Sequence, residues 1–218
     1  MTDYSKLDHL SLKAQKEGYP ARSVYKLKEM DEKFALLRGS GSPFKVLDLG
    51  AAPGSWSLYI LRKHKHVSLI SVDLSPLSGQ LKQPGQLKQP GQFDGGFSEK
   101  SSFTFIQGDF THSEIREAIL SQGPYNLVVS DAAPATSGNR SLDTLRSLAL
   151  SEIALDYAET ALAEGGNFVV KVFQGGDTSS LLKKIRSLFG TGKSFKPQAC
   201  RSESFETYYL GLGKKINE

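Results

Sequence analysis

Short apolar segments alternate with helix-forming segments along most of this chain, and this alternation restricts its fold more than any other feature. The strand-like segments are rich in β-branched residues and apolar at consecutive positions, which is typical of parallel strands covered on both faces. They cover residues 45–49, 67–72, 103–106, 126–130 and 167–173, and the helical segments cover 55–65, 113–121, 142–163 and 178–188. Such an alternation predicts an α/β fold with a doubly wound, mostly parallel sheet.

The C-terminal part of the chain departs from this alternation. Two strand-like segments, 193–195 and 205–212, are separated by too few residues for a helix. We therefore expect the sheet to end in a hairpin, which brings the predicted strands to seven. Gly165 and Gly166 precede the strand at 167–173, and this pair predicts the end of the long helix before it.

The length of 218 residues suits a single domain, 1–218. Its first part, 1–40, contains a predicted helix at 23–37 whose apolar side chains recur every three or four positions. Residues 78–100 contain two copies of the hexapeptide QLKQPG and a glycine-rich run, a composition that predicts a flexible low-complexity insertion.

Several classes of protein are disfavoured by what the sequence lacks. It has no apolar segment of membrane-spanning length and no secretory signal at its N-terminus, and its single cysteine, Cys200, is typical of a reducing cytoplasm. The scattered histidines give no spacing for metal ligands, so we expect no metal.

Positive charge gathers towards the C-terminus. The net charge is +4, and residues 181–218 hold 8 Lys and Arg against 3 Asp and Glu. Basic surfaces attract nucleic acid through counterion release, although charge alone fits a solvated surface of no special function better. The candidate phosphate contacts are Lys183, Lys184, Arg186, Lys193, Lys196, Arg201 and the N-terminal Arg22.

A glycine-rich turn, from Gly50 to Gly54, follows the first predicted strand and its Asp48. Ligands of doubly wound sheets bind at the carboxyl ends of the strands. Asp73 and Asp109 close the next two strands, so three carboxylates could accept hydrogen bonds from a ribose or an adenine amine and face a positive charge. Aspartates are also common helix caps and turn residues, which leaves that alternative open for each one. The turn lacks the G-x-G-x-x-G spacing of dinucleotide sites, which disfavours a nicotinamide cofactor.

One charged residue interrupts an otherwise apolar strand, Lys171 in FVVKVF. An unpaired buried ammonium is costly, so this lysine should be paired, neutral or at the edge of a cleft. Asp131 closes the preceding strand, and the two strand ends could lie side by side. A lysine in a partly dry cleft can act as a general base, although it could also extend to water from the end of the sheet.

With these motifs in order, the chain resembles the FtsJ/RrmJ family of RNA ribose 2′-O-methyltransferases, close to its compact bacterial branch that acts on a uridine of ribosomal RNA. The resemblance covers residues 13 to the C-terminus apart from 78–100. It is carried by KAQKEGYPARSVYKLKEM in the N-terminal leader, DLGAAPGSW in the cofactor loop, IQGDF on the adenine side, SDAAP around the catalytic aspartate, VVKVFQG around the lysine and KPQACRSESFETYYLGLG at the end.

The resemblance implies a Rossmann-like class I fold with S-adenosyl-L-methionine as the methyl donor. The implied catalytic tetrad is Lys26, Asp131, Lys171 and Glu206, with Lys171 as proton acceptor. With the residues noted above, the cofactor-binding set becomes Asp48, Gly50, Gly54, Trp56, Asp73, Asp109 and Asp131. Carboxylates favour a protonated lysine, so desolvation, the cofactor's sulfonium and Lys26 would have to oppose them at Lys171.

The implied substrate is structured RNA, in particular large-subunit (23S) ribosomal RNA, free or within the ribosomal subunit. We expect a cytoplasmic monomer that uses neither a membrane nor DNA. Transfer RNA or another RNA as substrate, a non-catalytic RNA-binding relative, and a nicotinamide-dependent oxidoreductase remain as alternatives. The chain departs from the family pattern at Ser55, in place of a glycine, at Ala135, in place of an asparagine, and at Glu203 and Phe205, where arginines are common.

Overall fold

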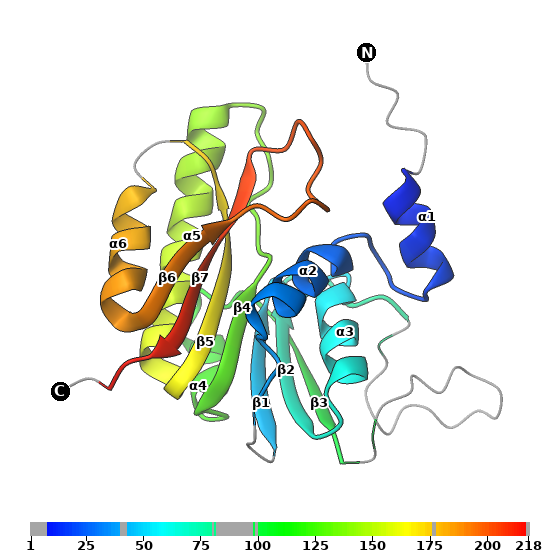
Figure 1. Ribbon diagram of the computed structural model, residues 1–218, viewed down its shortest axis with the longest axis vertical. Coiled ribbons are helices and arrows are strands. Elements are labelled where there is room, and N and C mark those ends of the chain that lie inside the picture. The colour runs from blue at the N-terminus through cyan, green and yellow to red at the C-terminus, as the bar shows by residue number, and fades with distance from the viewer. Residues whose placement is uncertain are drawn as a thin grey trace.

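The computed structural model describes residues 8–39, 43–79, 81, 98, 100–175 and 178–216. Within these residues, seven strands form one sheet in the order β3-β2-β1-β4-β5-β7-β6, with helices on both faces (Figure 1). The strands are β1 Phe44–Leu49, β2 Val67–Asp73, β3 Ser102–Gln107, β4 Tyr125–Ser130, β5 Leu162–Phe173, β6 Phe189–Phe195 and β7 Glu206–Lys214. The helices are α1 His9–Lys16, α2 Val24–Phe34, α3 Ser55–Lys63, α4 Ser113–Leu120, α5 Arg140–Ala161 and α6 Ser179–Leu188.

The predicted doubly wound sheet and its C-terminal hairpin are confirmed. The first five strands pair in parallel, and β7 lies antiparallel to both β5 and β6. The chain runs outward from β1 to β3 and then returns to β4 beside β1, so the strand order reverses between β1 and β4. In such sheets, the carboxyl ends on either side of the reversal form the ligand crevice.

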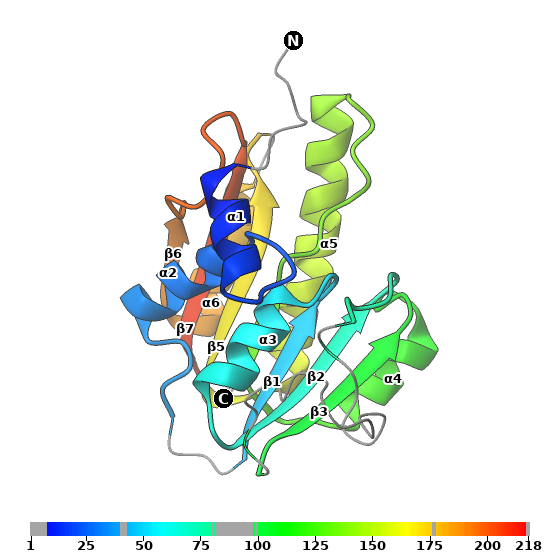
Figure 2. The same cartoon turned by 90° about the vertical axis from the view of Figure 1, so that its right-hand side faces the viewer.

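Two apolar layers cover the sheet, one on each face. Leu27 and Met30 of α2 pack with Leu58 of α3 and with α1 in one layer. Leu155 and Ile185 belong to the other layer, which α4, α5 and α6 form (Figures 1 and 2). The strands read as apolar throughout because both of their faces are buried.

The glycine pair is placed differently from the prediction. Helix α5 ends at Ala161, and Gly165 and Gly166 lie inside β5. The register between β4 and β5 shifts beside them, between Tyr125 and Leu127. The predicted helix stop at the pair was therefore wrong, because glycine also suits the irregular backbone of a β-bulge.

Most of the predicted insertion at 78–100, and its flexibility, lie outside the described residues. Leu81 is described, however, and it is only 5% exposed in the same apolar layer as α2 and α3. This part of the segment therefore contributes to the core. Among the described residues, no helix combines the length and the hydropathy needed to cross a membrane.

Candidate active site

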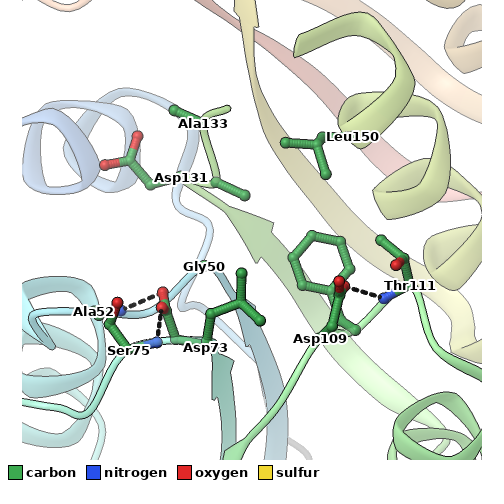
Figure 3. Close-up of a pocket in the computed structure, with 12 residues that line it drawn as sticks. Gly50, Ala52, Asp73, Ser75, Asp109, Thr111, Asp131, Ala133 and Leu150 are labelled. Carbon is green, nitrogen blue, oxygen red and sulfur yellow. Dashed lines mark hydrogen bonds between the residues drawn. The ribbon is translucent and has the colours of Figure 1, made fainter. Parts of the chain in front are cut away.

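A pocket of about 380 Å³ opens at the carboxyl edge of the parallel strands (Figure 3). We call it the strand-end pocket. Its wall consists of Gly50, Ala52, Asp73, Leu74, Ser75, Asp109, Phe110, Thr111, Asp131, Ala132, Ala133 and Leu150. Four residues predicted to bind the cofactor, Gly50, Asp73, Asp109 and Asp131, thus line one cavity.

Hydrogen bonds to the backbone hold two of the carboxylates in place. Asp73 accepts from the amides of Ala52 and Ser75, each at 2.8 Å (Figure 3). Asp109 accepts from the amide of Thr111 at 2.9 Å, and this hydrogen bond helps to hold the pKa of Asp109 below its ordinary value. Both carboxylates are thereby held in place as hydrogen-bond acceptors, as the recognition of hydroxyl and amino groups requires.

Gly50 allows the turn after β1 to approach the loop after β4. Its φ is +74°, and a Cβ atom there would lie 2.6 Å from the Cα of Ala132. A side chain would be strained by the backbone angle and would collide with the opposite wall of the pocket. The glycine thus lets the two loops close one end of the strand-end pocket.

Three other predicted cofactor residues lie behind the wall and not in it. Asp48 is fully buried, with Oδ2 accepting from the hydroxyl of Ser57 at 2.6 Å. Gly54 is the N-cap of α3. Trp56 is 2% exposed, and its Nε1 donates to the carbonyl of Ser23 at 2.9 Å. None of the three is among the residues that line the strand-end pocket.

The predicted pairing of Lys171 with Asp131 is present. The Nζ of Lys171 lies 2.5 Å from the backbone oxygen of Asp131 and 3.1 Å from its Oδ1. Lys171 is buried, with 7% of the residue exposed, and α5 fixes its backbone through the hydroxyl of Ser151, which donates to the carbonyl of Lys171. Asp131 also lines the strand-end pocket, so the lysine sits beside the cavity with one carboxylate between.

A second ion pair completes the predicted tetrad. The Nζ of Lys26, on α2, lies 2.6 Å from Oε1 of Glu206, at the start of β7. Tyr208 lies between the two pairs: its hydroxyl donates to Asp131 Oδ1 at 2.6 Å, and Lys26 Nζ lies 6.0 Å from the centre of its ring. Elements distant in sequence thus bring the four predicted residues into one cluster around a buried tyrosine.

Tyr208 is a member of this cluster that the sequence analysis missed. A usable signal was present, because residues two apart in a strand point to the same face and Tyr208 follows Glu206 by two positions. It is fully buried, and its pKa is well above the ordinary value because of burial and the negative charges of Asp131 and Glu206. The phenol is therefore a permanent donor to Asp131.

The cluster keeps Asp131 ionised. Burial works against its charge, but Lys171, Lys26 and the hydroxyl of Tyr208 outweigh burial and hold the pKa of Asp131 below its ordinary value. A carboxylate that contacts both the Nζ of Lys171 and the hydroxyl of Tyr208 has little freedom to rotate. It can therefore orient a neighbouring amine and also present negative charge to the strand-end pocket.

Residues 19–214 of the chain match the model of the FtsJ-like methyltransferases. The chain belongs to the FtsJ-like methyltransferase family. It is 47% identical over 213 residues to the ribosomal RNA large subunit methyltransferase E of Treponema denticola, covering 97% of each chain. The protein of the same name from Borreliella afzelii is 42% identical over 204 residues, covering 94% of this chain and 96% of that one.

A solved structure supports the fold of this methyltransferase. A ribosomal RNA methyltransferase from Plasmodium falciparum has a TM-score of 0.67 and 23% identity, covering 91% of this chain and 100% of that one. The family match makes the chain a methyltransferase and removes the oxidoreductase alternative.

The departures from the family pattern have clear locations in the methyltransferase. Ser55 is the first residue of α3, and its hydroxyl accepts from the amide of Ala21 at 2.8 Å. Glu203 accepts from the hydroxyl of its neighbour Ser202. Ala135 is exposed. The guanidinium carbon of Arg140 lies 5.2 Å from the centre of the Phe205 ring. None of these four positions belongs to the ion pairs of the tetrad.

The candidate phosphate contacts do not share one surface. Lys193 lies 5.8 Å from the ring centre of Phe34, on α2, the helix that carries Lys26. Lys183 and Lys184 belong to α6, which packs on the other face of the sheet. Arg22 is already engaged, because its guanidinium binds Asp8 and the carbonyl of Ala199. The basic side chains near α2 are therefore better placed than those on α6 to contact a substrate at the tetrad.

Proposed function

We propose that this methyltransferase transfers a methyl group from S-adenosyl-L-methionine to a ribose 2′-hydroxyl of RNA, most specifically a uridine of large-subunit ribosomal RNA. The observation that carries the proposal is the buried Lys171–Asp131 pair, in which one partner also lines the strand-end pocket. The names of relatives at 47% and 42% identity support the ribosomal substrate. A ribosomal substrate also favours a cytoplasmic location.

The strand-end pocket suits a cationic adenosyl ligand. Its wall presents three carboxylates, from Asp73, Asp109 and Asp131. Behind them, Oδ1 of the buried Asp48 has no hydrogen-bond partner among the described residues. Asp73 would hold ribose hydroxyls and Asp109 the adenine side, while Asp131 would face the positive charge near the methionine end.

S-adenosyl-L-methionine, when bound, supplies a methyl group already activated on its sulfonium. The protein must then position the ribose hydroxyl and remove its proton. We assign proton removal to the Nζ of Lys171, which Asp131 holds at the edge of the strand-end pocket through its backbone oxygen and its carboxylate. In the proposed transfer the 2′-oxygen would take the methyl group as the bond between that group and the sulfonium sulfur breaks and a neutral thioether leaves, while the hydroxyl proton would pass to the Nζ of Lys171.

The ion pair of Lys26 and Glu206 adds further charges near Lys171. The side chains of Lys26 and Glu206 are 12% and 13% exposed, so solvent reaches this pair, and we place the entry of the ribose hydroxyl beside it. Lys26 opposes positive charge at Lys171, and a bound sulfonium adds to that effect. The proposed transfer requires Lys171 to enter the step as a neutral amine.

The test is methylation of purified RNAs with a labelled methyl donor. Large-subunit ribosomal RNA, assembled large subunits and transfer RNA are offered separately, and the modified nucleotide is mapped by its resistance to alkaline cleavage. Incorporation at one uridine ribose of large-subunit RNA is expected. Incorporation on a base, or on transfer RNA alone, would replace the proposed substrate.

A further inference from the structure

A second pocket, of about 330 Å³, lies beside the tetrad and shares no residue with the strand-end pocket. It is formed by the first turns of α5 and the loop after β5, and its lining residues are Arg140, Ser141, Thr144, Leu145 and Gly175. We call it the Arg140 pocket. Gly175 follows Lys171 by four positions, so the catalytic strand leads directly into this pocket.

The Arg140 pocket contains a buried polar atom without a partner. Thr144 is 5% exposed, and its Oγ1 has no hydrogen-bond partner among the described residues. The atom faces Gly175, where an added Cβ would lie 3.3 Å from Oγ1. Gly175 has a φ of +136°, a conformation that other residues rarely adopt. A buried hydroxyl left unpaired in this way is costly, which points to a ligand that accepts its hydrogen bond.

The other groups around the pocket favour an anion. Arg140 supplies a guanidinium at the N-terminus of a 22-residue helix, where the helix dipole also favours negative charge. Asn139 already accepts from the amides of Ser141 and Leu142, so the ligand would be held by side chains. The nearby carboxylate of Asp143 is directed away, since it accepts from the amide and the hydroxyl of Ser137 at 2.8 Å.

Phe205 joins the Arg140 pocket to the catalytic cluster. The guanidinium of Arg140 lies over the Phe205 ring, and the carbonyl of Phe205 accepts from the amide of Gln174 at 2.7 Å. Phe205 immediately precedes Glu206, the partner of Lys26. Phe205 would thus connect an anion bound by Arg140 to the Lys26–Glu206 pair, beside which we place the entry of the ribose hydroxyl.

We propose that the Arg140 pocket binds a backbone phosphate of the RNA next to the methylated nucleotide, with Arg140 as the cation and Thr144 as the buried donor. This inference rests on the proposed RNA substrate and adds a site that fixes its register. Phosphate contacts position a nucleic acid without reading its sequence. An enzyme that methylates a ribose needs such positioning of the RNA backbone.

The experiment measures RNA affinity for the wild type, Arg140→Gln and Thr144→Val, with Arg146→Gln as the matched control. Arg146 is an exposed arginine of the same helix that does not line the pocket. Each protein is titrated with substrate RNA and with RNAs that carry one neutral methylphosphonate at successive positions around the modified nucleotide. Cofactor affinity is measured by calorimetry in parallel.

Arg140→Gln should weaken RNA binding by about tenfold, as expected for one charge-assisted hydrogen bond, and flatten the salt dependence by about one phosphate contact. One methylphosphonate position should weaken the wild type and Arg146→Gln similarly but leave Arg140→Gln unaffected. Thr144→Val should weaken binding several-fold, and cofactor affinity should stay the same in all variants.

The proposal is overturned if Arg140→Gln behaves like Arg146→Gln, or if every methylphosphonate weakens the wild type and Arg140→Gln equally. The latter result would indicate that Arg140 stacks on a base. A changed cofactor affinity would also overturn it, by assigning the pocket to the other ligand. Because the readout is RNA binding, absence of ribose methylation would refute the proposed function while the phosphate site would still be tested.

Discussion

The stability of an Asp48→Asn variant relative to the wild type should rise as the pH rises above 5. Burial, reinforced by the charges of Asp131 and Asp73 and opposed by the hydrogen bond from Ser57, raises the pKa of Asp48 from its ordinary value of 3.8 to about 7. The folded state therefore holds this proton more tightly than the unfolded chain. The free energy of unfolding must fall as the pH rises between these two values, and the penalty is almost fully present about one unit above pH 7.

The size of the effect follows from the separation of the two pKa values. Each unit is equivalent to about 1.36 kcal/mol, and most of the window from 3.8 to about 7 lies between pH 5 and pH 8. The wild type should thus lose roughly 2–3 kcal/mol of stability over this interval through Asp48 alone. An asparagine does not titrate, so the free energy of unfolding of the variant does not fall with pH through this position. This holds for any value of the variant's stability at pH 5.

Urea unfolding of both proteins at pH 5, 6, 7 and 8, without cofactor, measures the difference directly. The stability of Asp48→Asn relative to the wild type should rise with pH, and other titrating groups cancel in the difference. In the Ser57→Ala background the rise should move to higher pH, because the hydroxyl that stabilises the ionised form is gone. A difference that does not change with pH would refute the account of a strained, proton-binding carboxylate behind the pocket.

Two further predictions concern the cluster and the RNA surface. Tyr208→Phe removes a hydrogen bond to an ionised carboxylate and should lower the single-turnover rate about 10- to 100-fold with cofactor affinity unchanged; a rate within twofold of the wild type would contradict this role. Reversing the charges of Lys193 and Lys196 should weaken RNA binding and flatten its salt dependence. The effect should exceed that of reversing Lys183 and Lys184 on the opposite face of the sheet. Equal effects of the two double substitutions in filter-binding titrations would count against RNA contact by the surface near α2.

The sequence was informative wherever local pattern and chemistry agreed. Apolar strands, the hairpin and the pairing of Lys171 with Asp131 could all be predicted, because a buried lysine needs a partner and neighbouring strand ends provide one. Gly165 could not be assigned correctly from the sequence, because glycine is favoured both at a helix end and in a β-bulge.

The limits at the candidate site have a similar cause. Asp48 looks like a ligand-binding residue in sequence, but only the packing of α3 against β1 shows that it lies behind the cavity wall. The position of Arg140 over Phe205 joins residues far apart in the chain, and no local pattern announces such a contact.

Single-turnover methyl transfer by Lys171→Met addresses the assignment of the base more directly than any other measurement. Methionine fills the space of the lysine stem without its amine. With cofactor and RNA affinities within a few-fold of the wild type, the rate of ribose methylation should fall by at least 100-fold, as expected when a positioned base is lost. A folded variant that binds both partners and methylates the same ribose at a near-normal rate would show that the proton leaves by another route.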